Sequence, residues 1–194
     1  ILNEEDQSRD FDKTCCIILD RFTSWIQSYA APTKSAQETK KAFQRFLGPQ
    51  IEPQHVYSDN SKEIAKAMED LGFSHDTSTP HRSETNGIAE RAVRRVKEGT
   101  ASTLTQSGFA DFWWSEAMTC YCFLRNIVDL LTSGHTAYYQ RFGVDYQGPT
   151  IPFGAHISYQ PSYHKDKARL HALGERRLQG IFVGYAQHAG GGWT

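Results

Sequence analysis

The sequence predicts an α/β fold in which a mixed sheet is flanked by helices and followed by a small β-rich module. Two strand patterns open the chain, and amphipathic helices then alternate with further strand patterns up to about residue 133. Beyond residue 134, glycines and prolines punctuate short β-like runs. We therefore expect a main domain over residues 1–133 and a smaller module over residues 134–194.

The opening strands are predicted within residues 14–30. The run Cys15 to Leu19 is short and apolar, a polar turn follows at Asp20-Arg21, and a second strand pattern covers residues 25–29. Pro32 cannot donate a ladder hydrogen bond and ends this pair.

The first helix is predicted to begin at Ser35, because Ser35 and Glu38 have the spacing of a capping box and an apolar stripe follows. A short strand is expected over residues 55–58. It is followed by an amphipathic helix that stops at Gly72 and by a further strand over residues 73–78.

Two longer helices complete the main domain, one over about residues 88–104 and one over about residues 111–131. In the module, the β-like runs are residues 155–159 and 180–185. Trp113 and Trp114 begin the second long helix, and we interpret them as core or interface anchors rather than as base-stacking groups.

Composition narrows the classes of protein that remain. The formal net charge is −1, so a nucleic-acid-binding role must rest on local clusters of charge. No apolar run is long enough to cross a bilayer, and the opening residues do not have the pattern of a secretory signal. The four cysteines lie in apolar surroundings without a ligand spacing, which favours buried thiols in a reducing, intracellular setting.

The apolar run at Val56 delivers a carboxylate, Asp59, where a strand ends, and open α/β sheets place their active sites at such ends. A strand-end aspartate also serves as a helix N-cap, so Asp59 alone does not decide between these roles. His55, His75 and His81 lack a ligand spacing and are interpreted as ordinary hydrogen-bonding residues.

Glu90 lies near the start of the first long helix and shares one helical face with Arg94 and Lys97. The structural alternative is a solvated face held by ion pairs four residues apart. With Arg91 and Arg95 the helix carries four cations within seven residues, which is denser than helix stabilisation needs and suits a phosphate backbone.

Together these motifs resemble the integrase core of copia-type long-terminal-repeat retrotransposons, a relative of the retroviral integrases in the ribonuclease-H-like superfamily. The resemblance spans nearly the whole chain in several ordered motifs. They are Asp20-Arg21-Phe22-Thr23-Ser24-Trp25, Val56-Tyr57-Ser58-Asp59-Asn60, Pro80-His81, Asn86-Gly87-Ile88-Ala89-Glu90-Arg91, Thr136-Ala137-Tyr138 to Phe142-Gly143, Pro152-Phe153-Gly154-Ala155 and Gly180-Ile181-Phe182-Val183-Gly184-Tyr185.

The resemblance implies a ribonuclease-H-like fold and integration of DNA by two-metal polynucleotidyl transfer. Asp59 matches the second and Glu90 the third of the carboxylates that hold two Mg²⁺ ions, with Mn²⁺ as a substitute. It further implies a homo-oligomer acting on element ends and target DNA, located in the nucleus and, before that, in cytoplasmic particles. The matching DNA-contacting positions are Asn86, Arg91, Arg94 and Lys97.

The sequence departs from the family pattern at its start. The first catalytic aspartate is expected at or just before residue 1, so we interpret the chain as N-terminally truncated; Asp6 is the nearest acidic residue but lies too close to Asp20. The gap between Asp59 and Glu90 holds 30 residues, fewer than usual, and Ser61 replaces a common glycine. The alternative to an active enzyme is a decayed or co-opted DNA-binding or protein-binding relic of a Pol polyprotein.

Overall fold

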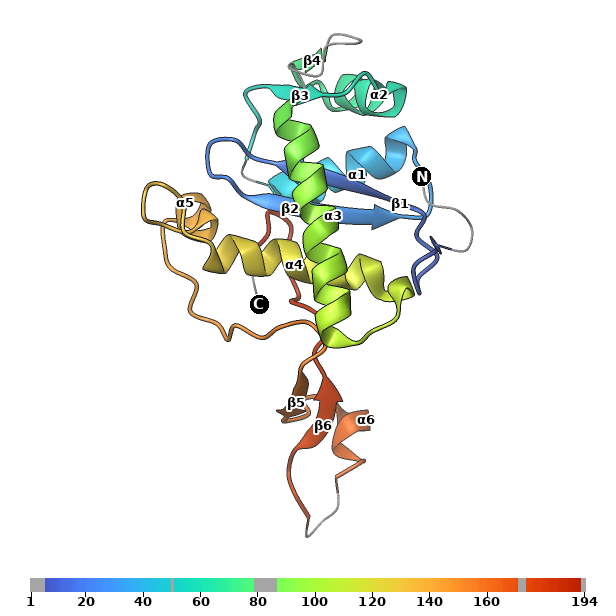
Figure 1. The fold of residues 1–194 in the computed structure, drawn as a ribbon, viewed down its shortest axis with the longest axis vertical. Helices are drawn as coiled ribbons and strands as arrows, with labels where there is room; N and C mark the ends of the chain where they lie inside the picture. Colours follow the sequence, from blue (N-terminus) through green and yellow to red (C-terminus); the bar gives the residue numbers. More distant parts are fainter. Residues whose placement is uncertain (1–5, 50, 79–86, 171–173, 193–194) are drawn as a thin grey trace.

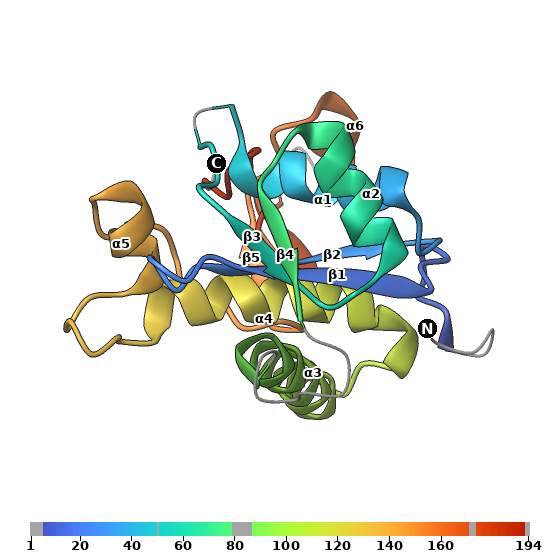
Figure 2. The same ribbon diagram turned by 90° about the horizontal axis from the view of Figure 1, so that it is seen from above.

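The computed structural model describes residues 6–49, 51–78, 87–170 and 174–192. The strands of the main domain lie between two helical layers, whereas a further pair of strands extends beyond them (Figures 1 and 2). The first two strands, β1 (Thr14–Leu19) and β2 (Ile26–Ala31), pair antiparallel with Cys16 opposite Tyr29. The predicted hairpin is confirmed, and the Asp20 carboxylate closes its turn by accepting a hydrogen bond of 3.0 Å from the backbone N–H of Phe22.

Helix α1 (Ala36–Leu47) begins where the capping pattern predicts. The Ser35 hydroxyl accepts a hydrogen bond of 3.2 Å from the backbone N–H of Glu38, which satisfies one of the free N–H groups of the first turn. The helix then buries an apolar stripe that includes Phe43 and Phe46.

A strand–helix–strand unit follows α1. Strand β3 (Val56–Ser58) and strand β4 (His75–Thr77) pair in parallel, with helix α2 (Lys62–Leu71) as the crossover between them. Gly72 ends α2 in the left-handed conformation, φ 71°, which a glycine adopts without steric cost.

The two long helices cover the other side of the strands. Helix α3 (Gly87–Ser107) contacts β1, and helix α4 (Trp114–Val128) packs on β2, whereas α1 and α2 lie on the opposite face (Figure 2). A short 3₁₀ turn, η3 (Asp111–Trp113), precedes α4. The outcome is the α/β layer architecture that the sequence predicts.

The described strands of the main domain form two separate pairs, β1–β2 and β3–β4, rather than one continuous mixed ladder. Asn126 of α4 protects the outer edge of β2. Its side chain accepts a hydrogen bond of 3.0 Å from the N–H of Ile26 and donates one of 2.8 Å to the carbonyl of the same residue. Because Asn126 is fully buried, these two hydrogen bonds fix α4 on the strand.

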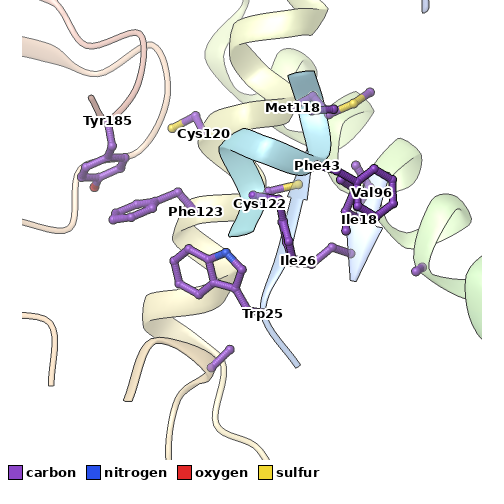
Figure 3. Close-up of a cluster of buried hydrophobic side chains, with 14 of the residues drawn as sticks. Ile18, Trp25, Ile26, Phe43, Val96, Met118, Cys120, Cys122, Phe123 and Tyr185 are labelled. Carbon is purple, nitrogen blue, oxygen red and sulfur yellow. The ribbon is translucent and has the colours of Figure 1, made fainter. Parts of the chain in front are cut away.

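The core joins both halves of the chain. Figure 3 shows the ring of Phe123 between Trp25 and Tyr185, and the Phe123 and Tyr185 ring centroids are 4.5 Å apart. Ala137, Phe153 and Tyr185, all beyond residue 134, belong to the same buried cluster as the residues of β1, β2 and α4.

Residues 134–192, as far as they are described, hold more helix than the sequence predicts. Helices α5 (Ala137–Phe142) and α6 (His164–Lys167) accompany strands β5 (His156–Tyr159) and β6 (Leu178–Ile181), which pair antiparallel. Local signals for α5 are present in the sequence, since Thr136 caps its first turn. No helix in the described ranges is long and apolar enough to span a membrane.

Candidate metal and nucleic-acid site

Asp59 directly follows β3 and is exposed to solvent. The N-cap of α2 is Ser61, so the alternative in which Asp59 serves as the cap is not what the structure shows. Within the described residues, no hydrogen bond or ion pair involves the Asp59 carboxylate. Its oxygens are therefore available to a ligand.

The backbone beneath Asp59 is held from both sides. The Ser58 hydroxyl donates a hydrogen bond of 2.7 Å to the carbonyl of Asp59, and it also lies 2.9 Å from Nε2 of His75 on β4. The N–H of Ser78 donates to the carbonyl of Ser58 at 2.9 Å. These contacts fix the end of β3. They confirm the hydrogen-bonding role predicted for His75, whereas its contact with Ser58 was not predicted from the sequence.

The electrostatic influence of Asp59 reaches β1. Burial raises the pKa of the Cys16 thiol to about 12, and the negative charge of Asp59 adds to this effect. The charge of Asp59 is therefore felt at β1.

Glu90 lies in the first turn of α3 and is likewise exposed. Among the residues placed by the structure, its carboxylate has no hydrogen-bond or ion-pair partner. The partial positive charge of a helix N-terminus favours an acidic group there. Figure 1 places this end of α3 at the same end of the molecule as β3 and β4. A short distance between the Asp59 and Glu90 carboxyl groups stays a prediction.

The cations of α3 are exposed and lie outside its buried stripe, which includes Ala92 and Val96. In the described part of the chain none of them forms an ion pair, so Glu90 and Arg94 do not make the bond that the solvated-face alternative requires. The cations in question are Arg91, Arg94, Arg95 and Lys97. Their charge is thus not neutralised by the fold.

The other predicted residues divide into two groups. Asn86 and His81 lie outside the described residues. His55 contacts the Ser74 hydroxyl at 3.2 Å and Asp76 at 3.4 Å, so its hydrogen-bonding role is confirmed. Trp114 is buried and donates to the carbonyl of Asp6 at 3.0 Å, which confirms its role as a core anchor.

The cysteines are free thiols in the structure. Cys120 and Cys122 are buried, as predicted, whereas Cys15 and Cys16 are half-buried. Burial raises the pKa of Cys120 and of Cys122 to about 12, so both are protonated at neutral pH. Over the described ranges, no group of three His, Cys, Asp or Glu residues is arranged to hold a metal ion.

Two plant Pol polyproteins are similar to this chain in sequence. The chain is 27% identical over 188 residues to the retrovirus-related Pol polyprotein from transposon RE1 of Arabidopsis thaliana, which covers 92% of the chain and 12% of the polyprotein. It is 29% identical over 116 residues to the corresponding RE2 polyprotein of the same plant, covering 57% of the chain and 8% of that protein. The chain thus spans about one eighth or less of these relatives. No protein-family model matches it.

Two solved viral structures have a fold similar to that of this chain. The catalytic core domain of HTLV-2 integrase, determined in complex with magnesium, matches with a TM-score of 0.52 at 17% identity over 68% of the chain and 86% of that domain. A chain of the simian T-cell lymphotropic virus intasome, in complex with a PP2A regulatory subunit, matches with a TM-score of 0.54 at 16% identity over 91% of this chain and 63% of that one. The protein therefore has the fold of an integrase catalytic core, and its sequence is similar to parts of the RE1 and RE2 Pol polyproteins.

Proposed function

We propose that this chain is the core portion of a retrotransposon integrase, which binds DNA and joins element ends to target DNA. The observation that supports it best is the pairing of two unengaged carboxylates, Asp59 and Glu90, with the unneutralised cations of α3. Most other carboxylates near the core are engaged in the fold; Asp20, for example, closes the β1–β2 turn. The relationship to the RE1 and RE2 polyproteins supports the same class.

Asp59 and Glu90 are the metal-holding residues in this proposal. Mg²⁺ prefers hard oxygen ligands. Within the described residues, no oxygen of either carboxylate accepts a hydrogen bond or forms an ion pair. Mn²⁺ accepts the same ligands. When bound, a pair of such ions would activate an attacking oxygen and stabilise the leaving oxygen of a phosphodiester.

The chain's own contribution is to hold DNA in position. The exposed cations Arg91, Arg94 and Lys97 would contact phosphates along one face of α3, and Asn86 is assigned to the same surface from the family resemblance. Ser58 and His75 would keep the Asp59 backbone in place through the hydrogen bonds at the end of β3. In the working complex, located in the nucleus, we expect several copies to act together on two DNA ends.

The same proposal assigns only two of three catalytic carboxylates to the 194 residues. We therefore expect the 194-residue polypeptide by itself to show little strand joining. Loss of a single essential catalytic group often costs several orders of magnitude in rate. The alternative function is a DNA-binding or protein-binding relic, and the unneutralised α3 cations suit a DNA-binding relic as well as an enzyme.

One experiment separates these functions. A labelled DNA end is incubated with target DNA and Mg²⁺ or Mn²⁺, once with the 194-residue polypeptide and once with a version extended by an N-terminal strand that carries an aspartate. We expect metal-dependent joined product with the extended version only, and its loss in Asp59→Asn. If the extended protein binds DNA but never joins it, the relic is the correct function. Efficient joining by the 194 residues alone would refute the assignment of only two carboxylates.

A further inference from the structure

Tyr57 is an aromatic residue of β3, two residues before Asp59, and it is 43% exposed. Side chains alternate between the two faces of a strand, so residues two apart share a face. The pairing of β3 with β4 continues to Ser58, whose carbonyl accepts a hydrogen bond from Ser78, and Asp59 comes directly after it. Tyr57 and Asp59 are therefore neighbours on one face.

Contacts between β3 and β4 agree with this placement of Tyr57. In the parallel register Tyr57 lies opposite Asp76, and His55, two residues before Tyr57, is 3.4 Å from the Asp76 carboxylate. On the other face, the Ser58 hydroxyl is 2.9 Å from Nε2 of His75. The two faces of β3 thus carry different contacts, and Tyr57 lies on the face that ends in the unengaged carboxylate of the proposed site.

The backbone on both sides of Tyr57 is held, but its side chain is not. The N–H of Val56 donates to the carbonyl of Ser74 at 2.8 Å, and the carbonyl of Ser58 accepts from the N–H of Ser78 at 2.9 Å. The Tyr57 side chain forms neither a hydrogen bond nor a ring contact with any residue that the structure describes. A tyrosine ring has only two side-chain torsions to fix, so on a rigid backbone it offers contact area at a low entropic cost.

The charges beside Tyr57 determine which part of a nucleotide suits it. Asp59 and Asp76 are exposed acids on the same face, and of the two only Asp76 has an ion-pair partner, His55, among the described residues. These acids repel a phosphate that is not held by a metal ion at Asp59. A base carries no charge, and it stacks on an aromatic side chain whatever its identity. The base of a nucleotide is therefore the part that fits the Tyr57 ring.

The spacing along β3 suits a nucleotide next to the reacting phosphate. Two residues of a strand span about 6.6 Å, and successive nucleotides of one DNA strand are about 3.4 Å apart along the helix axis. A base within one or two nucleotides of a phosphate held at Asp59 can therefore reach Tyr57. Inside a duplex the neighbouring bases cover both faces of a base, so only an unpaired base can offer a face to a side chain.

We propose that Tyr57 stacks on an unpaired base next to the phosphate held at Asp59. The chain then prefers a DNA end with a single-stranded overhang to a blunt duplex end. This inference rests on the proposed function for the position of the phosphate, and it adds a residue that positions the substrate. The ring takes no part in breaking or forming the phosphodiester bond.

Binding to a pair of DNA probes in Mn²⁺ tests the proposal. One probe is a duplex whose short overhang contains 2-aminopurine, a fluorescent base whose emission falls when it stacks, and the other is the matching blunt duplex. The wild-type chain should bind the overhang probe more tightly and quench its emission. Tyr57→Ala should weaken overhang binding at least about fivefold and relieve the quenching, while blunt-end binding changes less than about twofold. Tyr57→Trp keeps an aromatic face and should behave as wild type.

The matched control is Tyr163→Ala, because Tyr163 is also an exposed tyrosine but precedes α6, and this variant should bind both probes as wild type does. Equal wild-type affinity for the two probes, or unchanged overhang binding in Tyr57→Ala, would overturn the inference and leave the proposed function standing. If overhang binding depends on Tyr57 but the extended protein joins no DNA, the catalytic part of the proposed function fails and the inference holds. A wild-type chain that binds neither probe would refute both.

Discussion

The fold makes no use of the carboxylates of Asp59 and Glu90 within the described residues, whereas it engages those of Glu63 and Asp20. Glu63 accepts a hydrogen bond of 2.6 Å from Ser61, and Asp20 accepts two bonds within its turn. Exposed carboxylates with no partner contribute little to stability, and their removal should leave the fold intact. Their places, directly after β3 and in the first turn of α3, together with these unengaged oxygens, are the physical reason to place them in a ligand site.

The first prediction concerns these two residues. Asp59→Asn and Glu90→Gln should each unfold with a free energy within about 0.5 kcal/mol of wild type, as surface substitutions usually do. Both should abolish any rise in melting temperature that Mn²⁺ gives the wild-type chain, because each removes a charged ligand. Thermal melts with and without Mn²⁺ measure this, and Glu69→Gln on α2 is the control. A metal-dependent shift that persists in both variants would contradict the assignment.

Burial controls the chemistry of the cysteines. The pKa of Cys122 is raised from an ordinary value of 9.0 to about 12, chiefly because the thiolate would be buried without water. A thiol whose pKa is raised in the folded state adds stability below its unfolded pKa. That contribution is lost as the pH rises from about 9 toward 12.

A second prediction follows for Cys120 and Cys122. At pH 8 only about one buried thiol in 10⁴ is ionised at such a pKa, so alkylation should be far slower than in urea-unfolded protein. Mass spectrometry after brief iodoacetamide treatment checks this. The urea-unfolded protein is the comparison, because the pKa of Cys16 is also raised to about 12 in the folded chain. Rapid labelling of Cys122 in the folded chain at pH 8 would show that it is not buried as described.

At the scale of single elements, α3 combines a buried face with a charged face. Ala92, Val96 and Thr100 hold it against the core, while its cations stay in solvent without partners. Because the two faces are separate, the charged face can be changed without unpacking the helix. The helix is therefore the element on which DNA binding can be tested most cleanly.

The third prediction is that Arg94→Ala with Lys97→Ala weakens DNA binding and flattens its salt dependence. Each phosphate contact adds about 0.9 to the magnitude of the slope of log affinity against log salt, so losing two should lower that magnitude by about 2. Fluorescence anisotropy across a salt series measures this. Lys40→Ala with Lys62→Ala is the matched control and should keep the wild-type slope. An unchanged slope in the α3 variant would remove these residues from the DNA surface.

At the scale of the whole molecule, the sequence predicted the structural features that depend on residues close together in the chain. The Ser35 cap, the β1–β2 hairpin and the carboxylate after β3 all follow from local pattern and spacing. It could not predict the support of Asp59 by Ser58 and His75, because that contact requires β3 and β4 to be paired. The helices α5 and α6 were missed because glycines and prolines around them dominate the local pattern.

The packing of the post-core segment also lies beyond local pattern. Arg141 of α5 donates hydrogen bonds to the carbonyl of Gly190, at 2.9 Å, and to that of Phe46, at 2.5 Å. Its guanidinium lies 5.4 Å from the ring centroid of Trp25. One side chain thus joins α1, the β1–β2 turn region and the last described residues. The predicted boundary near residue 134 therefore separates segments that share a core.

The last prediction tests that shared core. Deleting residues 134–194 removes Ala137, Phe153 and Tyr185 from the buried cluster and uncovers Phe123, so we expect the remaining residues 1–133 to lose cooperative unfolding. Arg141→Met keeps the volume but leaves two carbonyl groups without their donor, at about 1–3 kcal/mol each. It should lower the unfolding free energy measured in urea without abolishing the fold. Lys66→Met on α2, which removes only exposed ion pairs, should change it by less than about 1 kcal/mol. If residues 1–133 unfold as cooperatively as the full chain, the post-core segment is an independent module and the core ends at the predicted boundary.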